Sequence, residues 1–121
     1  MANESIDISK QLPDGSIVLC GANAYDEKYF FNPDFQKLPE SVKKELNIIC
    51  VLYTKETGGI FYIYFDEEGN LEFGEKSAEE DIMYDTVTAA LLIGEIRRNR
   101  RELIEQLEMF YDAFIEGGKT E

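Results

Sequence analysis

The sequence predicts an α+β domain with a mainly antiparallel sheet, one short helix, and a long C-terminal helical region that either continues unbroken or breaks once. Three observations lead to this class. Two runs rich in β-branched and aromatic residues, 48–54 and 60–65, flank a Gly-Gly turn. Apolar residues recur every four positions in Pro39–Leu46, as in a short amphipathic helix. The last third of the chain, Ser77–Gly118, has the pattern of a helix.

The strands are expected in two groups. Ile17–Cys20 and Tyr25–Phe31 are separated by a Gly-Ala-Asn break and form an irregular hairpin. Ile48–Thr54, Ile60–Phe65 and a strand that begins at Leu71 form a three-stranded antiparallel meander. The expected order is therefore strand, strand, helix, three strands, helix.

The middle strand of this meander is apolar on both of its faces, whereas an antiparallel sheet with one wet face alternates apolar and polar residues. Both faces therefore need cover. The face that carries the tyrosines is the predicted site of partial exposure or of contact with a partner. The residues on the two faces are Phe61, Ile63 and Phe65 on one side, and Ile60, Tyr62 and Tyr64 on the other.

The C-terminal helical region has clear start and stop signals. Ser77 and Glu80 fit a capping box, and Gly117-Gly118 is a typical C-terminal stop. A single straight helix of this length would span about 58 Å, whereas a domain of this size has a radius of gyration near ~14 Å. We therefore expect a break around Gly94, or excess helix that packs against another subunit. The apolar positions of this region are Met83, Val87, Ala90 and Leu91, then Ile96, Leu103, Leu107, Phe110 and Phe114.

Composition excludes several classes of function. The net charge is −13, so the chain repels nucleic acid and anionic membranes outside a localised basic patch. No histidine is present, which removes the usual general base, the commonest metal ligand and the Ser-His and Cys-His nucleophile pairs. Cys20 and Cys50 each lie in an apolar run and are expected to be buried, structural and reduced. With no signal peptide and no membrane span in the sequence, we expect a cytoplasmic protein.

The four arginines of the chain, Arg97, Arg98, Arg100 and Arg101, form its sharpest local feature. On a helix these residues fan round more than one turn, so they do not make a compact patch. A solvated or intramolecularly paired segment is the first interpretation. The second is an interface or anion-binding site that meets acidic groups of a partner or of a second copy. Phosphate or nucleic-acid binding is disfavoured because interleaved aromatic residues are missing.

No other stretch predicts a catalytic or metal site. The acidic segment 66–70 lacks the spacing of a calcium loop and is expected to be a hairpin turn. The acids at 79–81, together with Asp85, are explained by the start of the helix. We therefore predict no catalytic residue, no metal ligand and no cofactor.

Three motifs carry a resemblance to a known family. They are LCGANAYDEKYFFNPDF (Leu19–Phe35), IICVLYTKETGGIFYIYFDEEGN (Ile48–Asn70) and LLIGEIRRNRRELIEQLEMFY (Leu91–Tyr111). Together they resemble a small uncharacterised family of clostridial-type bacteria, known only as a domain of unknown function. The resemblance extends over Val18–Gly117. It implies a bacterial, cytoplasmic, stand-alone domain and supplies no activity, ligand or catalytic residue.

The order of elements is also similar to that of profilin-like and roadblock-type modules, which are often dimeric binding scaffolds. Residues 1–14 are expected to be a flexible tail, and residues 15–118 a single domain. The leading hypothesis is a small acidic interaction or regulatory protein that acts as a homodimer and is not an enzyme. The alternative is a small-ligand-binding domain or an enzyme that uses carboxylates or the cluster Arg97–Arg101.

Overall fold

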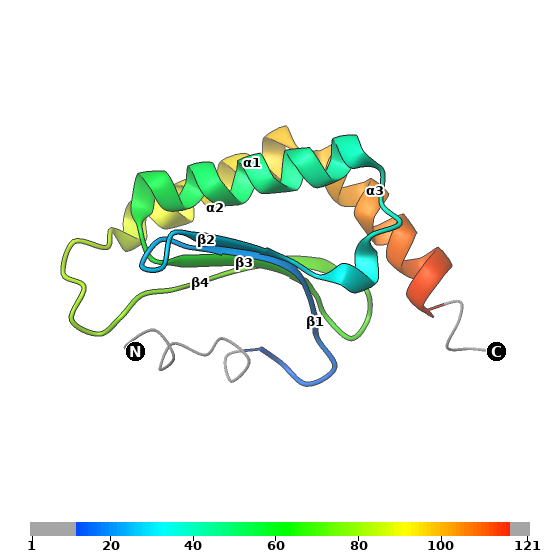
Figure 1. Cartoon of the computed structure of the whole chain (residues 1–121), viewed down its shortest axis with the longest axis horizontal. Helices are drawn as coiled ribbons and strands as arrows, with labels where there is room; N and C mark the ends of the chain where they lie inside the picture. Colours follow the sequence, from blue (N-terminus) through cyan, green and yellow to red (C-terminus); the bar gives the residue numbers. More distant parts are fainter. Residues whose placement is uncertain (1–11, 117–121) are drawn as a thin grey trace.

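The fold has two layers, a four-stranded antiparallel sheet and a set of helices that lie on one of its faces (Figure 1). The computed structural model describes residues 12–116. The strand order in the sheet is β2-β1-β3-β4, which confirms the α+β class. In chain order the elements are β1 (Ile17–Asn23), β2 (Lys28–Phe31), the 3-10 turn η3 (Pro33–Phe35), α1 (Glu40–Thr57), β3 (Ile60–Phe65), β4 (Leu71–Lys76), α2 (Thr86–Asn99), α3 (Arg101–Tyr111) and the π-helical turn η4 (Asp112–Glu116).

Two hairpins build the sheet, and both are expected from the sequence. β1 pairs with β2, as the first apolar runs predicted, and β3 pairs with β4 across the acidic turn. In that turn the carboxylate of Asp66 accepts hydrogen bonds from the backbone N–H groups of Asn70 and Glu68, both at 2.9 Å. These bonds, that of Asn70 above all, hold the pKa of Asp66 below its usual value. The segment is therefore a hairpin turn.

The prediction of a strand at 48–54 is wrong, because these residues form the second half of α1. The expected three-stranded meander is therefore the β3–β4 pair alone, and β1 takes the place beside β3. The Gly-Gly pair ends a helix and does not turn a hairpin. Gly58 has φ 78° and Gly59 has φ 71°, so both lie in the left-handed region that favours glycine.

A helical period explains this outcome. The residues of α1 that face the sheet recur at intervals of three and four along its length. The 48–54 run has the composition of a strand, rich in β-branched and aromatic residues, because apolar residues also occupy the face of the helix opposite the sheet. Propensity favoured a strand, and the longer period over the whole segment decided the structure. The buried residues of α1 are Leu46, Ile49, Cys50, Tyr53, Thr54 and Thr57.

The C-terminal helical region starts later than predicted. Ser77 lies in a loop that follows β4, and the helix begins at Thr86. The N-cap is Asp85, whose side chain accepts hydrogen bonds from the backbone N–H groups of Val87 and Thr88. The capping box predicted at Ser77 is therefore wrong, and Asp85 satisfies the orphan donors of the first turn in its place.

The break in this region lies at Arg100 and not at Gly94, which sits inside α2. Arg100 has φ −117° and ψ 31°, so it leaves the helical geometry for one residue. The change of direction brings Leu103, Leu107 and Tyr111 of α3 into the core. The predicted stop at Gly117-Gly118 lies outside the described residues.

The core fills the space between the sheet and the helices. Phe65 of β3 is completely buried, and its ring lies 5.6 Å from that of Phe35 and 4.9 Å from that of Tyr111, measured between centroids. Cys20 and Cys50 are also buried, as predicted, and their Sγ atoms lie 3.7 Å apart as free thiols. The face of β3 that carries phenylalanines is therefore the one that the helices cover.

On the other face of β3, Ile60 and Tyr62 are buried and Tyr64 is half-buried. The ring of Tyr62 lies over Gly74 of β4, where a Cβ atom would stand 2.3 Å from the ring. This position therefore has no room for any side chain. Of the predicted tyrosine face, only Tyr64 keeps partial exposure.

Candidate functional site

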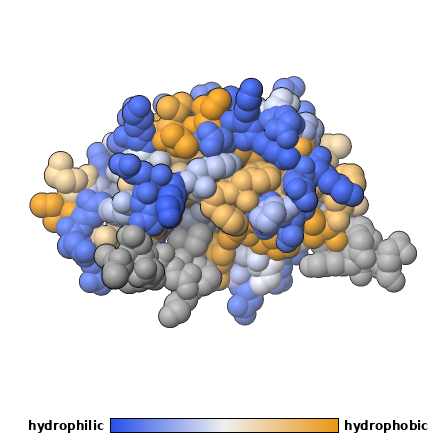
Figure 2. Space-filling view, viewed as in Figure 1, coloured by the Kyte–Doolittle hydropathy of each residue, from blue (hydrophilic) through white to orange (hydrophobic). Residues whose placement is uncertain are grey.

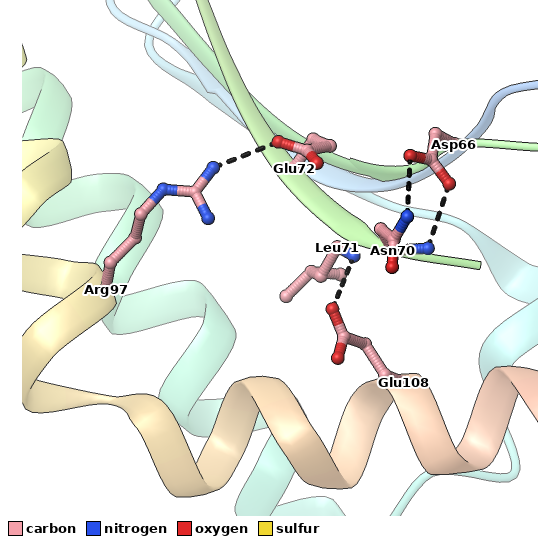
Figure 3. A network of polar contacts seen from close by, with 6 residues as sticks. All are labelled: Asp66, Asn70, Leu71, Glu72, Arg97 and Glu108. Carbon is pink, nitrogen blue, oxygen red and sulfur yellow. Dashed lines mark hydrogen bonds and ion pairs between the residues drawn. The ribbon is translucent and has the colours of Figure 1, made fainter. Parts of the chain in front are cut away.

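The four arginines are not brought together by the fold. Arg97, in the last turn of α2, bonds to Glu72 of β4 with an Nη2–Oε1 distance of 3.0 Å (Figure 3). Its guanidinium carbon also lies 4.8 Å from the centre of the Phe73 ring. Close to this contact, the backbone N–H of Leu71 donates to Glu108 of α3 at 2.8 Å. These contacts fasten the edge strand β4 to α2 and α3.

Arg100 points to a different element. Its Nη1 atom bonds to Oε2 of Glu45 in α1 at 2.7 Å, at the junction between α2 and α3. Glu45 lies in the first half of α1, so the C-terminal end of α2 lies beside the N-terminal half of α1. At the other end, Tyr84 precedes α2 and contacts Tyr53, in the second half of α1, with an O–O distance of 3.2 Å. The helices α1 and α2 are therefore antiparallel neighbours.

Arg98 and Arg101 are exposed, and neither forms an ion pair with any of residues 12–116. Two of the four predicted site residues thus hold the fold together, while the other two present free guanidinium groups to solvent. This division of the cluster could not be predicted from the sequence, because both acidic partners, Glu72 and Glu45, come from distant elements.

A group of apolar side chains lies on the outer surface of α1 and α2, which faces away from the sheet. Figure 2 shows part of it as an apolar area over α1, at the top of the view. We call it the outer helical surface. Val87 and Leu91 of α2 expose 68% and 65% of their area, values expected of polar residues and not of a core stripe. Its members are Ile48 and Leu52 of α1, Val87 and Leu91 of α2, and Ile82 and Met83 of the preceding loop. Val51 is also exposed, but it lies on the side of α1 that faces the β1–β2 hairpin.

A groove runs between the two helices on this surface. It has a volume of about 460 Å³. Apolar side chains form most of its wall, and Glu56, Glu95 and Arg100 lie at its edges. Since Arg100 is already bonded to Glu45, its guanidinium is not free to act as an anion anchor. The remaining groove residues are Ile49, Leu52, Tyr53, Leu92, Ile96 and Asn99.

The exposed stripe on α2 arises because the buried face of this helix is a different one. Ala89 is fully buried, and Leu92, Ile93 and Ile96 pack against the core. Met83, Val87 and Leu91 recur every four residues, and they were predicted, with Ala90, as apolar positions of the helical region; Met83 precedes the helix in the structure. The helix therefore carries two apolar stripes. In the sequence, the core-facing stripe is recognised by the apolar residues that lie between and after the exposed ones.

Two polar contacts of tyrosine hydroxyls tie elements of the fold together. The hydroxyl of Tyr84 donates to Glu75 Oε1 at 2.8 Å, and burial raises the pKa of Tyr84 above its usual value. The hydroxyl of Tyr25 bonds to the carboxylate of Asp81, so the loop before α2 is anchored to the β1–β2 hairpin. Within residues 12–116, no three acidic or cysteine side chains converge in a way that would hold a metal ion.

Comparison with models of protein families shows to which family the chain belongs. The model of a family of unknown function, DUF6145, matches residues 16–119. The chain belongs to this family. The predicted resemblance to an uncharacterised family is thereby confirmed, over nearly the range expected from the three motifs. Membership in DUF6145 brings no activity or ligand with it.

Comparison with curated proteins and with solved structures finds no match to the chain. Among the helices of the described region, none has the length and apolar content needed to cross a membrane.

Proposed function

We propose that this protein is a small interaction or regulatory protein of the bacterial cytoplasm that acts as a homodimer and not as an enzyme. One observation carries the proposal: two neighbouring helices expose apolar side chains on the face turned away from their own core. Monomeric soluble proteins rarely keep contiguous apolar patches of this kind, and larger ones mark interaction sites. The outer helical surface is the proposed interface.

The usual size of a specific interface indicates that both α1 and α2 take part in the contact. Specific interfaces bury about 800 Å² on each partner, a size that takes about 20–30 residues on each side. α2 alone offers too few side chains for this, whereas α1, α2 and the loop that contains Ile82 and Met83 together form a broad face. Packing this face against a copy of itself makes a layer of four helices between two sheets. The similarity to profilin-like and roadblock-type scaffolds was expected from an order of elements that included a strand at 48–54, and these residues are helical, so it adds no support to this role.

The alternative, a small-ligand-binding domain or an enzyme built on carboxylates or arginines, has weaker support. The groove between α1 and α2 is large enough for a small molecule. However, Glu45 and Glu72 already engage Arg100 and Arg97. Of the charged groups that line the groove, Arg100 is bonded to Glu45, which leaves the carboxylates of Glu56 and Glu95 to contact a ligand.

The proposal predicts a dimer in solution. We expect light scattering coupled to size-exclusion chromatography to give twice the monomer mass at micromolar concentration, with dissociation on dilution. Addition of metal ions, nucleotides or phosphorylated metabolites is expected to leave the melting temperature unchanged. A monomeric mass across the whole concentration range would remove the homodimer, and a clear thermal shift with one ligand would favour the alternative.

A further inference from the structure

We infer that α2 packs antiparallel against α2 of a second copy, so that Arg98 and Arg101 of each copy pair with Glu79 and Glu80 of the other. This inference rests on the proposed homodimer and specifies its geometry. It also gives a role to the two arginines that the fold leaves free. An interface of this type is isologous, because the same residues of both copies meet across a two-fold axis.

Charge is distributed unequally along α2. The loop before the helix carries Glu79 and Glu80, both exposed and without a side-chain partner among residues 12–116. The far end carries Arg98 and, after the break, Arg101. Figure 1 shows this loop at one end of the helical layer and the α2–α3 junction toward the other. Only an antiparallel arrangement of two α2 helices places the acidic end of each beside the basic end of the other.

The exposed stripe and the free arginine share one face of the helix. Val87, Leu91, Gly94 and Arg98 follow one another at intervals of four, three and four residues, which is the spacing of neighbours on a helical surface. Arg98 lies seven residues beyond Leu91, or about 10 Å along the axis. A two-fold axis near Leu91 therefore brings Arg98 close to the loop of the second copy.

Small residues in the middle of the stripe permit a close approach. Ala90 is exposed, and a Cβ atom placed on Gly94 would meet only the guanidinium of its own Arg98, at 3.5 Å. Gly94 is thus not needed for any contact within the described chain, and it does not break the helix. Small residues at a helix crossing let two backbones approach, and Val87 and Leu91 then pack around the crossing point.

Local charge, and not net charge, is what matches a second copy. Each copy carries a net charge of −13, so two copies repel each other at long range, as the chain also repels a nucleic acid. At short range, however, the antiparallel pair places two arginines of each copy against two glutamates of the other. Complementary charges at the rim of an interface set the orientation of the partners more than the affinity.

The test is a charge swap in the full-length chain. The double variant Arg98→Glu/Arg101→Glu places acids against acids in its homodimer, and Glu79→Arg/Glu80→Arg places arginines against arginines. Each is expected to raise the dissociation constant at least about tenfold, because juxtaposed like charges are costly. In an equimolar mixture both ends of the interface become complementary again, and we expect a heterodimer close to wild-type affinity. Sedimentation velocity with one variant fluorescently labelled measures all three constants.

The matched control is Glu67→Arg/Glu68→Arg, which makes the same change in charge in the exposed β3–β4 turn. Both glutamate variants make the chain less acidic. If general repulsion between the copies were the only effect, both variants would therefore form stronger dimers. We expect weakening only for the variant at 79 and 80. Unchanged dimerisation of both swapped variants, or no preference for the heterodimer on mixing, overturns the antiparallel geometry while the homodimer itself stands. If the wild-type protein is monomeric, both the proposed homodimer and this geometry are wrong.

Discussion

Leu91→Glu is expected to convert the proposed dimer into a folded monomer. Leu91 lies at the centre of the proposed contact between the two α2 helices and is 65% exposed in the single chain. The substitution therefore removes apolar burial and places a charge in the interface without disturbing the core. A loss of about 3 kcal/mol, usual when a large apolar side chain is removed from a packed site, raises the dissociation constant about 100-fold. Sedimentation equilibrium measures it.

Met109→Glu is the matched control for this variant. Met109 of α3 is 69% exposed, so the change has the same chemistry on a surface outside the outer helical surface. We expect this variant to remain dimeric, and both variants to keep the wild-type circular dichroism spectrum. Equal dimerisation of Leu91→Glu and wild type would place the interface elsewhere.

Phe65→Ala is expected to reduce the free energy of unfolding by about 3–5 kcal/mol, the usual cost of removing a buried aromatic side chain. Phe65 has no exposed area and packs between the rings of Phe35 and Tyr111, so it joins β3, η3 and α3. Small domains have about 5–15 kcal/mol of stability in all, so this loss is a large fraction. Urea denaturation followed by far-ultraviolet circular dichroism measures it at one fixed protein concentration.

Phe30→Ala serves as the comparison, because Phe30 exposes 52% of its surface on the edge strand β2. It is expected to cost less than 1 kcal/mol, in the range typical of surface substitutions. A similar cost for the two variants would mean that the contacts of Phe65 with Phe35 and Tyr111 do not form the core.

The sequence was sufficient for the features that depend on local signals. The β1–β2 hairpin, the acidic turn after Phe65 and the burial of both cysteines follow from turn residues and from apolar runs. The sequence failed at 48–54 because both the buried and the exposed faces of α1 are apolar there. Two exposed apolar residues of that run, Ile48 and Leu52, belong to the proposed interface.

The start and the break of the C-terminal helices were mispredicted because long-range contacts decide them. Tyr84 and Asp81 bond to residues of the sheet and of the β1–β2 hairpin, and these bonds hold the loop before α2 outside the helix. Arg100 bonds to Glu45, fifty-five residues away, at the point where α3 turns into the core. The division of the arginine cluster into paired and unpaired residues required the structure, and the role of the cluster as an interface stays a prediction.

A symmetric crosslink tests the proposed interface most directly. In the antiparallel dimer Leu91 lies close to its own copy, so Leu91→Cys is expected to give a covalent dimer with a short bismaleimide at micromolar concentration. Met109→Cys is expected to stay monomeric on a denaturing gel, and the native Cys20 and Cys50, which are buried, to remain unmodified. Efficient crosslinking through position 91 alone would support the outer helical surface as the interface. Equal crosslinking at positions 91 and 109, or none at 91, would contradict it.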